Sequence, residues 1–110
     1  MGAENPVGPM AGMEKNKFPT NDAQLQHIFR EAEGHLLDTP ANRSLVENTV
    51  NNSQNIIGKD MYGTQWYAQL QPDGSQVWVR TYNGTIINAG INAVARTFDP
   101  QTGLKNNPLK

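Results

Sequence analysis

The spacing of apolar residues predicts two helices in the first half of the chain. The first helix carries an apolar stripe at helical spacing, formed by Leu25, Ile28, Phe29 and Ala32. Asn21 is its expected N-cap, with Gln24 three residues on as in a capping box, and Gly34 is its expected left-handed stop. The second helix is expected to begin with Thr39 as N-cap and Pro40 at the first helical position. Its expected buried side is Leu45, Val46, Thr49 and Val50.

After Gly63 the apolar residues recur with a period of two, which predicts β-strands. Strands are expected over residues 65–70, 76–82 and 85–89. A turn at Pro72-Asp73-Gly74 joins the first two strands. Asn83-Gly84 predicts a type I′ hairpin between the last two, because that turn needs positive φ at both of its central positions.

The hairpin turn also predicts which residues of its two strands lie opposite each other. Counting back from the turn pairs Arg80 with Ile87, and Trp78 with Ala89. One face is then expected to carry Val77, Val79, Thr81, Ile86 and Asn88. The other face is expected to carry Trp78, Arg80, Tyr82, Thr85 and Ile87. Gly90 predicts a bulge or bend, after which residues 93–98 are expected to form a fourth strand at the edge.

These elements predict an α+β domain, with two N-terminal helices packed on a three- to four-stranded antiparallel sheet. A length of 110 residues leaves room for one domain, since a domain usually takes about 100–200 residues. The apolar residues of residues 1–19 show neither the helical period nor the strand period of two. This segment is expected to be a linker or the remnant of an upstream domain. The domain itself is expected over residues 20–104, followed by a tail over residues 105–110.

Composition narrows the classes of function. Apolar residues make up 36% and charged residues 17% of the chain, below the usual ~45–50% and ~25%. No window approaches the roughly 18 apolar residues of a membrane span, and the first residues lack the pattern of a signal peptide. With 2 histidines and 0 cysteines, neither a metal site nor a cofactor is expected.

The net charge of −1 argues against wholesale electrostatic coating of nucleic acid. The charge is unevenly placed, however, because acidic residues predominate in residues 1–40 and basic residues in residues 76–110. An anionic ligand is therefore expected to meet the C-terminal half of the chain.

Two histidines are the candidates for proton transfer, because imidazole titrates near neutral pH. His35 is the first choice as general acid or base. It follows the expected helix stop at Gly34, where the helix dipole would favour a protonated ring, and a capping or packing role is the alternative. His27 is the second choice. It lies opposite the apolar stripe of its helix, where a merely solvated side chain is the alternative.

Aromatic and basic residues gather in the predicted sheet, a pattern typical of RNA binding. Trp66, Tyr67 and Trp78 are candidates for stacking on bases, although Trp78 could equally be a core residue because both predicted faces carry apolar side chains. Arg80 lies beside Trp78 on one face, where it would pair with phosphate.

The last candidates are residues that could stabilise negative charge on a phosphoryl group. Arg96 and Thr97 offer a guanidinium and a hydroxyl donor on the expected fourth strand. Lys59, in the loop before the sheet, or Arg80 would assist them. The alternative for each of these residues is a solvated surface position.

A series of short strings runs through residues 25–104. They are His27-Ile28-Phe29-Arg30, Gly34-His35, Asp38-Thr39-Pro40-Ala41-Asn42-Arg43, Gly63-Thr64-Gln65-Trp66-Tyr67, Pro72-Asp73-Gly74-Ser75-Gln76-Val77-Trp78, Asn83-Gly84 and Asn88-Ala89-Gly90-Ile91-Asn92. Together they resemble the C-terminal toxin modules of bacterial polymorphic toxins, which end contact-dependent growth inhibition, filamentous-haemagglutinin-like and Rhs-type proteins. The Val-Glu-Asn-Asn peptide that often precedes such modules is not present as such, since Val46-Glu47-Asn48-Thr49 matches it only in part.

The resemblance implies a fold of the barnase/EndoU/colicin/RelE group and a metal-independent ribonuclease, with transfer RNA as the expected substrate. Attack of the 2′-hydroxyl on the adjacent phosphate would leave a 2′,3′-cyclic phosphate and a 5′-hydroxyl. The resemblance also implies delivery at the C-terminus of a larger secreted or cell-surface protein, and action in the cytoplasm of the target cell. A cognate immunity protein would protect the producing cell. We expect that partner to be acidic and to cover Arg80 and Arg96, with binding at a separate exosite as the alternative.

Two other classes of function are alternatives to the ribonuclease. One is a non-catalytic binding module, such as the immunity or adaptor protein of a toxin system. The basic C-terminal half fits poorly with an immunity protein that mimics RNA. The other is a nucleotide-modifying toxin such as a zinc deaminase, which the absence of cysteine disfavours.

Overall fold

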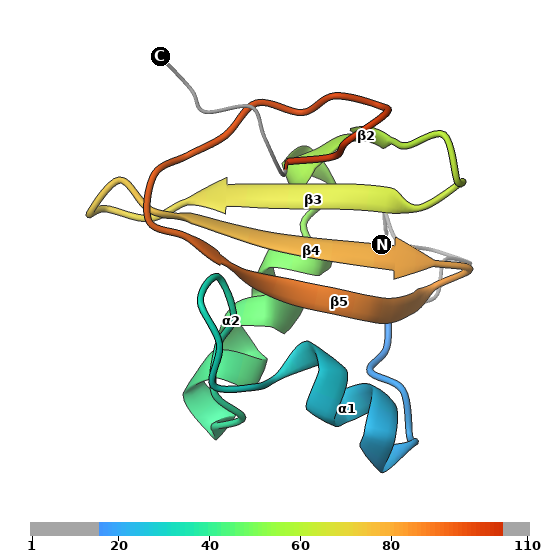
Figure 1. Ribbon diagram of the computed structural model, residues 1–110, viewed down its shortest axis with the longest axis vertical. Coiled ribbons are helices and arrows are strands. Elements are labelled where there is room, and N and C mark those ends of the chain that lie inside the picture. Colours follow the sequence, from blue (N-terminus) through green and yellow to red (C-terminus); the bar gives the residue numbers. More distant parts are fainter. Residues whose placement is uncertain (1–15, 105–110) are drawn as a thin grey trace, which may run out of the picture.

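The computed structural model describes residues 16–104 as an α+β domain. Its elements in chain order are α1 (Asp22–Ile28), α2 (Pro40–Val50), the short 3₁₀ helix η2 (Ser53–Asn55), β2 (Ile56–Lys59), β3 (Gln65–Leu70), β4 (Gln76–Tyr82) and β5 (Thr85–Asn92). The strands form one antiparallel sheet in the order β2-β3-β4-β5. Both helices lie on the same side of this sheet (Figure 1). The expected class, two helices with an antiparallel sheet, is confirmed.

The first described residues are part of the domain. The amide of Ile86 donates to the carbonyl of Lys17 at 2.8 Å, and the amide of Lys17 donates to the carbonyl of Gly84 at 2.9 Å. Phe18 packs against the core. The domain therefore begins before residue 20, because these residues pair with the β4–β5 hairpin. The rest of the expected linker, up to residue 15, and the expected tail over residues 105–110 lie outside the described residues.

Both predicted N-caps are present. The Asn21 side chain accepts a hydrogen bond from the amide of Gln24 at 3.2 Å, and the Thr39 hydroxyl accepts one from the amide of Asn42 at 3.1 Å. Each cap satisfies an amide that the first turn of the helix leaves without a partner. Pro40 occupies the first turn of α2, as expected.

The first helix is shorter than its apolar stripe predicts. α1 ends at Ile28, and Phe29 has an extended backbone that forms a β-bridge with Leu36. The Phe29 ring is only 5% exposed and lies 5.6 Å from the ring of Phe18. The expected continuation to Gly34 is therefore wrong. Residues 29–36 instead form a loop, because the bridge at Phe29 takes the chain out of the helix.

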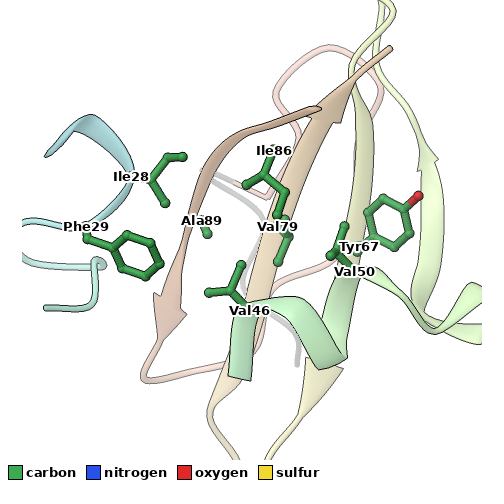
Figure 2. Packing of buried hydrophobic residues seen from close by; sticks show 8 residues of the cluster. All are labelled: Ile28, Phe29, Val46, Val50, Tyr67, Val79, Ile86 and Ala89. Carbon is green, nitrogen blue, oxygen red and sulfur yellow. The ribbon is translucent and has the colours of Figure 1, made fainter. Parts of the chain in front are cut away.

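The core lies between the helices and one face of the sheet (Figure 2). Its buried residues are Ile28, Phe29, Val46, Val50, Tyr67, Val79, Ile86 and Ala89. The aliphatic members from α2 and the sheet are almost fully buried. Each such side chain contributes about 1.5–3 kcal/mol of transfer free energy.

The fourth strand of the sheet is β2, not the expected strand over residues 93–98. β2 has four residues, too few to show a period in the sequence. The segment after β5 is irregular, and the buried side chain of Gln76 binds it. The side-chain Oε1 of Gln76 accepts from the backbone amide of Arg96 at 3.0 Å. The side-chain Nε2 of Gln76 donates to the backbone carbonyl of Arg96 at 2.9 Å. A side chain thus satisfies the backbone groups that a neighbouring strand would otherwise satisfy.

A β-bulge changes the predicted register of the hairpin. Thr81 pairs with Ile86 as expected, but Arg80 pairs with Asn88, so that Ile87 is the extra residue. The expected pairing of Arg80 with Ile87 is therefore wrong. Since opposite residues share a face, the bulge places Asn88 on the same face as Arg80. Ala89 moves to the core face, where it is buried.

Gly90 is not the site of the bulge, because β5 continues through it to Asn92. A Cβ atom at Gly90 would overlap the carbonyl oxygen of Gly34. That carbonyl accepts a hydrogen bond from the amide of Ile91 at 3.0 Å. The glycine at position 90 therefore lets the loop over residues 29–36 lie directly against β5.

Within residues 16–104, no helix has the length and apolar character needed to cross a membrane.

Candidate functional site

A cleft of about 660 Å³ opens beside the sheet face that the helices leave uncovered. Three strands (β3, β4 and β5), the end of α1, the loop over residues 29–36 and the segment after β5 contribute to its walls. The side chains with candidate chemistry in these walls are His27, Arg30, His35, Trp78, Arg80 and Arg96. Glu33 is the carboxylate among the lining residues, so the cleft has an excess of positive charge.

One guanidinium joins the two histidines. Nη1 of Arg30 lies 3.0 Å from Nδ1 of His27, and Nη2 lies 3.0 Å from Nε2 of His35. Because a guanidinium only donates hydrogen bonds, both of these ring nitrogens accept in this arrangement. The proton of His35 is then on Nδ1, which donates to the Ala89 carbonyl at 3.1 Å.

The surroundings of His35 favour its neutral form. Burial and the charge of Arg30 lower the pKa of His35 below its ordinary value of 6.5, and the carbonyls of Ile28 and Ala89 only partly oppose them. The expectation that a helix dipole favours a protonated ring is wrong, because α1 ends at Ile28 and His35 lies in the loop beyond it. The ring stands edge-on to Trp78, with centroids 5.8 Å apart. The neutral form of His35, which can accept a proton, is therefore favoured over the cation.

A row of side chains crosses three strands on the cleft face. Trp66 is paired with Arg80, and Arg80 with Asn88. The guanidinium carbon of Arg80 lies 4.9 Å from the centre of the Trp66 ring, within the range of a cation–π contact. The Nε atom of Arg80 is buried and has no hydrogen-bond partner within the described part of the chain. Such a donor is suited to an anion that enters the cleft.

Asp60 fixes the tryptophan on which Arg80 lies. One carboxylate oxygen accepts from the Trp66 indole at 2.9 Å, and the other accepts from the amides of Tyr62 and Thr64 at 2.9 and 3.0 Å. Burial alone would raise the pKa of Asp60, but these hydrogen bonds and the charge of Arg80 hold the pKa below its ordinary value of 3.8. The charged form of Asp60 thus holds Trp66 in its orientation in the wall of the cleft.

We expect Asp60→Asn to remove part of the acid sensitivity of the fold. A carboxyl group whose pKa is lowered by folding stabilises the protein above its unfolded pKa, and this stability is lost as the pH falls through the folded pKa. Urea unfolding between about pH 5 and pH 2 measures the effect. The midpoint of wild type should fall more steeply over this range than that of Asp60→Asn. Equal slopes would contradict the role given to Asp60, and Asp22→Asn is a matched control on an exposed carboxylate.

The three aromatic candidates for base stacking differ in how far the structure buries them. Tyr67 points to the opposite face, is 4% exposed and belongs to the core, so the expectation that it stacks on bases is wrong. Its neighbour Trp66 lines the cleft but is also only 4% exposed, because Phe98 lies beside it at 6.4 Å and Gly103 packs against its ring. Trp66 therefore supports Arg80 and presents little free surface. Trp78 is half-buried and keeps part of its ring accessible.

The structure places three candidates for phosphoryl stabilisation, Arg96, Lys59 and Thr97, differently with respect to the cleft. Arg96 lines the cleft, and its Nη1 donates to the Leu104 carbonyl at 3.4 Å. Lys59 is exposed on the edge strand β2 and is not among the residues that line the cleft. Thr97 is exposed and is likewise outside the lining. Only Arg96 of the three thus lines the same cleft as the histidines.

Arg30 and Asn88 line the cleft, although the sequence does not single them out as site residues. Arg30 lies three positions after His27 and five before His35, and this spacing was the available signal. Asn88 was assigned to the other face because nothing in the local sequence marks the bulge at Ile87. Within residues 16–104, histidine and carboxylate side chains form no group of three that could hold a metal ion.

Comparison of the chain with models of protein families, with curated proteins and with solved structures identifies no match.

Proposed function

We propose that this chain is the toxin module of a polymorphic toxin and a metal-independent endoribonuclease, with transfer RNA as its substrate. The observation that carries the proposal is one cleft whose lining includes both histidines and three arginines. Imidazoles and guanidiniums are the groups that phosphodiester cleavage needs in the absence of a metal ion. The order of two helices followed by an antiparallel sheet, with the cleft beside the open face, supports membership of the barnase/EndoU/colicin/RelE group.

The proposed reaction assigns one proton to each histidine. His35 accepts the proton of the ribose 2′-hydroxyl on Nε2 while the 2′-oxygen attacks the adjacent phosphorus. The bond from phosphorus to the 5′-oxygen breaks, and that oxygen takes a proton from the imidazolium form of His27. The products are a 2′,3′-cyclic phosphate and a 5′-hydroxyl. The lowered pKa of His35 supports its role as the base, because the ring is then neutral at pH 7.

Three guanidiniums are placed to stabilise the charge that develops on the phosphoryl oxygens. Arg80 lies on the Trp66 ring, and Arg30 and Arg96 line the same cleft. Removal of one preorganised donor of this kind typically costs about 10²–10³-fold in rate. Trp78 offers the partly accessible ring against which a base could stack.

Incubation of the purified protein with total RNA and a chelator tests the proposed function. We expect discrete cuts that carry 2′,3′-cyclic phosphate ends, with transfer RNA as the fraction consumed. RNA that remains intact would overturn the proposal. Expression in a host without an immunity gene separates the ribonuclease from a non-catalytic binding module, because only the ribonuclease should arrest growth and deplete transfer RNA.

The same cleft is the proposed binding surface of an acidic immunity protein. We expect Arg80→Ala and Arg96→Ala each to reduce RNA cleavage and to weaken immunity binding by about 2 kcal/mol, since buried arginine anchors concentrate interface energy. The association rate should also fall with increasing salt. Surface plasmon resonance with the cognate immunity protein measures the affinity and the association rate, and the RNA assay measures cleavage. Variants that lose cleavage but bind that partner as wild type does would place the interface at an exosite.

A further inference from the structure

Arg30 occupies an unusual position for a surface arginine. It is exposed, yet both of its terminal nitrogens point at imidazole nitrogens, one on each side. No carboxylate is paired with it within residues 16–104, where the ion pair of Arg43 with Asp38 shows the ordinary alternative. The guanidinium therefore keeps a full charge that its neutral partners do not neutralise.

We propose that Arg30 is a phosphate-responsive gate, which holds the lone pairs of His27 and His35 in the free protein and releases them when a phosphate group enters the cleft. The inference rests on the proposed function for the identity of the phosphate, which is that of the RNA backbone. It assigns to Arg30 a positioning role, because the residue controls when the two rings can exchange protons.

The exchange of partners follows from the strength of the competing hydrogen bonds. A phosphate accepts two parallel, charge-assisted bonds from a guanidinium, and such bonds are roughly twice as strong as those to a neutral acceptor. Arg30 is exposed, so water can replace its lost contacts during the exchange. Arg80, with its unpartnered Nε, and Arg96 line the same cleft and would hold the anion beside it.

Anion binding and proton uptake are then linked. Burial is the first cause of the lowered pKa of His35, and the charge of Arg30 is the second. Arg30 thus opposes protonation of His35 in two ways, because it occupies Nε2 and its charge disfavours the cation. An anion removes both effects and adds a favourable negative charge, so it raises the pKa of His35. By reciprocity, protonation of His35 strengthens anion binding by the same factor. The other ionisable groups that line the cleft with His35 are His27, Arg30, Glu33, Arg80 and Arg96.

A titration of the histidine rings by NMR tests the gate without any measurement of cleavage. Inorganic sulfate is the probe, because it is a tetrahedral oxyanion whose charge stays constant between about pH 5 and pH 8, where histidine titrates. We expect sulfate to raise the pKa of His35 in the wild-type protein. We also expect sulfate to bind about tenfold more tightly once His35 is protonated.

Arg30→Met distinguishes the gate from a simple effect of nearby negative charge. This variant has no guanidinium to bind the histidine rings, so the pKa of His35 should already be raised without sulfate. Added sulfate should then raise that pKa less than in wild type. Lys17→Ala removes one exposed charge outside the cleft and should titrate as wild type does. An equal response to sulfate in Arg30→Met and wild type would overturn the gate. Failure of sulfate to bind the wild-type protein would overturn it as well.

The two proposals fail separately. If sulfate raises the pKa of His35 as described but RNA stays intact, the ribonuclease is wrong and the gate stands. If RNA is cut while the rings titrate identically with and without sulfate, the gate is wrong and the ribonuclease stands.

Discussion

Replacement of His35 by glutamine is expected to lower the rate of RNA cleavage by about 10²–10⁴-fold, the usual contribution of a positioned general base. The Gly34 carbonyl still accepts from the Ile91 amide, at 3.0 Å in wild type, so the loop should stay against β5 in this variant. The glutamine amide cannot accept the proton of a 2′-hydroxyl. Single-turnover cleavage of a labelled transfer RNA, with the enzyme in excess, measures the chemical step directly.

The pH dependence of RNA cleavage should show the titration of the His35 ring. With the enzyme below saturation, the rate reports the groups of the free protein, in which the pKa of His35 lies below 6.5. Wild-type activity should then fall on the acid side of that value as the base is protonated. This acid limb should be missing from the residual activity of His35→Gln. Lys17→Gln serves as the control for a substitution outside the cleft. Cleavage by His35→Gln within a few-fold of wild type would remove His35 from the proposed mechanism.

The lowered pKa of His35 has a second consequence, for stability. The unfolded chain binds this proton more readily than the folded protein does. Stability is therefore lost as the pH falls from above the unfolded pKa through the folded pKa. His35→Gln should lessen this loss, and urea midpoints measured on either side of about pH 6.5 would show it.

Substitution of Gly90 by alanine is expected to have the largest effect on stability, about 3 kcal/mol, and to disable the cleft as well. The new methyl group would overlap the Gly34 carbonyl oxygen and lie 2.8 Å from the nearest Trp78 ring atom. The loop over residues 29–36 would have to leave β5, and the hydrogen bond from the Ile91 amide to Gly34 would break. His35 would move with the loop. Thermal unfolding and RNA cleavage should both report the change.

Gly74→Ala is the matched control for Gly90→Ala. Gly74 has a φ of +91° and no atom within 4 Å of the position of a Cβ. Alanine there should cost about 1–2 kcal/mol, because of the left-handed backbone alone, and should leave cleavage unchanged. If Gly90→Ala were no more destabilising than Gly74→Ala, the close contact of the loop with β5 would not hold the cleft together.

Much of the local structure could be predicted because its causes are local. Asn21, Thr39 and Pro40 determine the starts of α1 and α2 through caps that reach only three residues along the chain. The strands β3 and β4 coincide with the predicted ranges, since their apolar residues alternate over six and seven residues. Asn83 has a φ of 51° and Gly84 a φ of 80°, the positive values that a type I′ turn requires.

The errors arise where distant segments decide the outcome. α1 ends early because Phe29 pairs with Leu36, and the last strand continues past Gly90 because the loop packs against it. The residues over 93–98 form no strand, and within this segment the Gln76 side chain binds both backbone groups of Arg96. Each of these interactions joins residues that no local period connects.

The sequence by itself determined the fold class and the types of residue available for chemistry, because the periods, caps and turns act over a few neighbouring positions. Tertiary structure alone decided which of those residues meet. The bulge at Ile87 turned Asn88 to the cleft face, strand alternation buried Tyr67 in the core, and the loop brought His35 to Arg30 and Trp78. The physical reason is that a shift of one residue in register reverses the face of a side chain, and only the packed partners select the register.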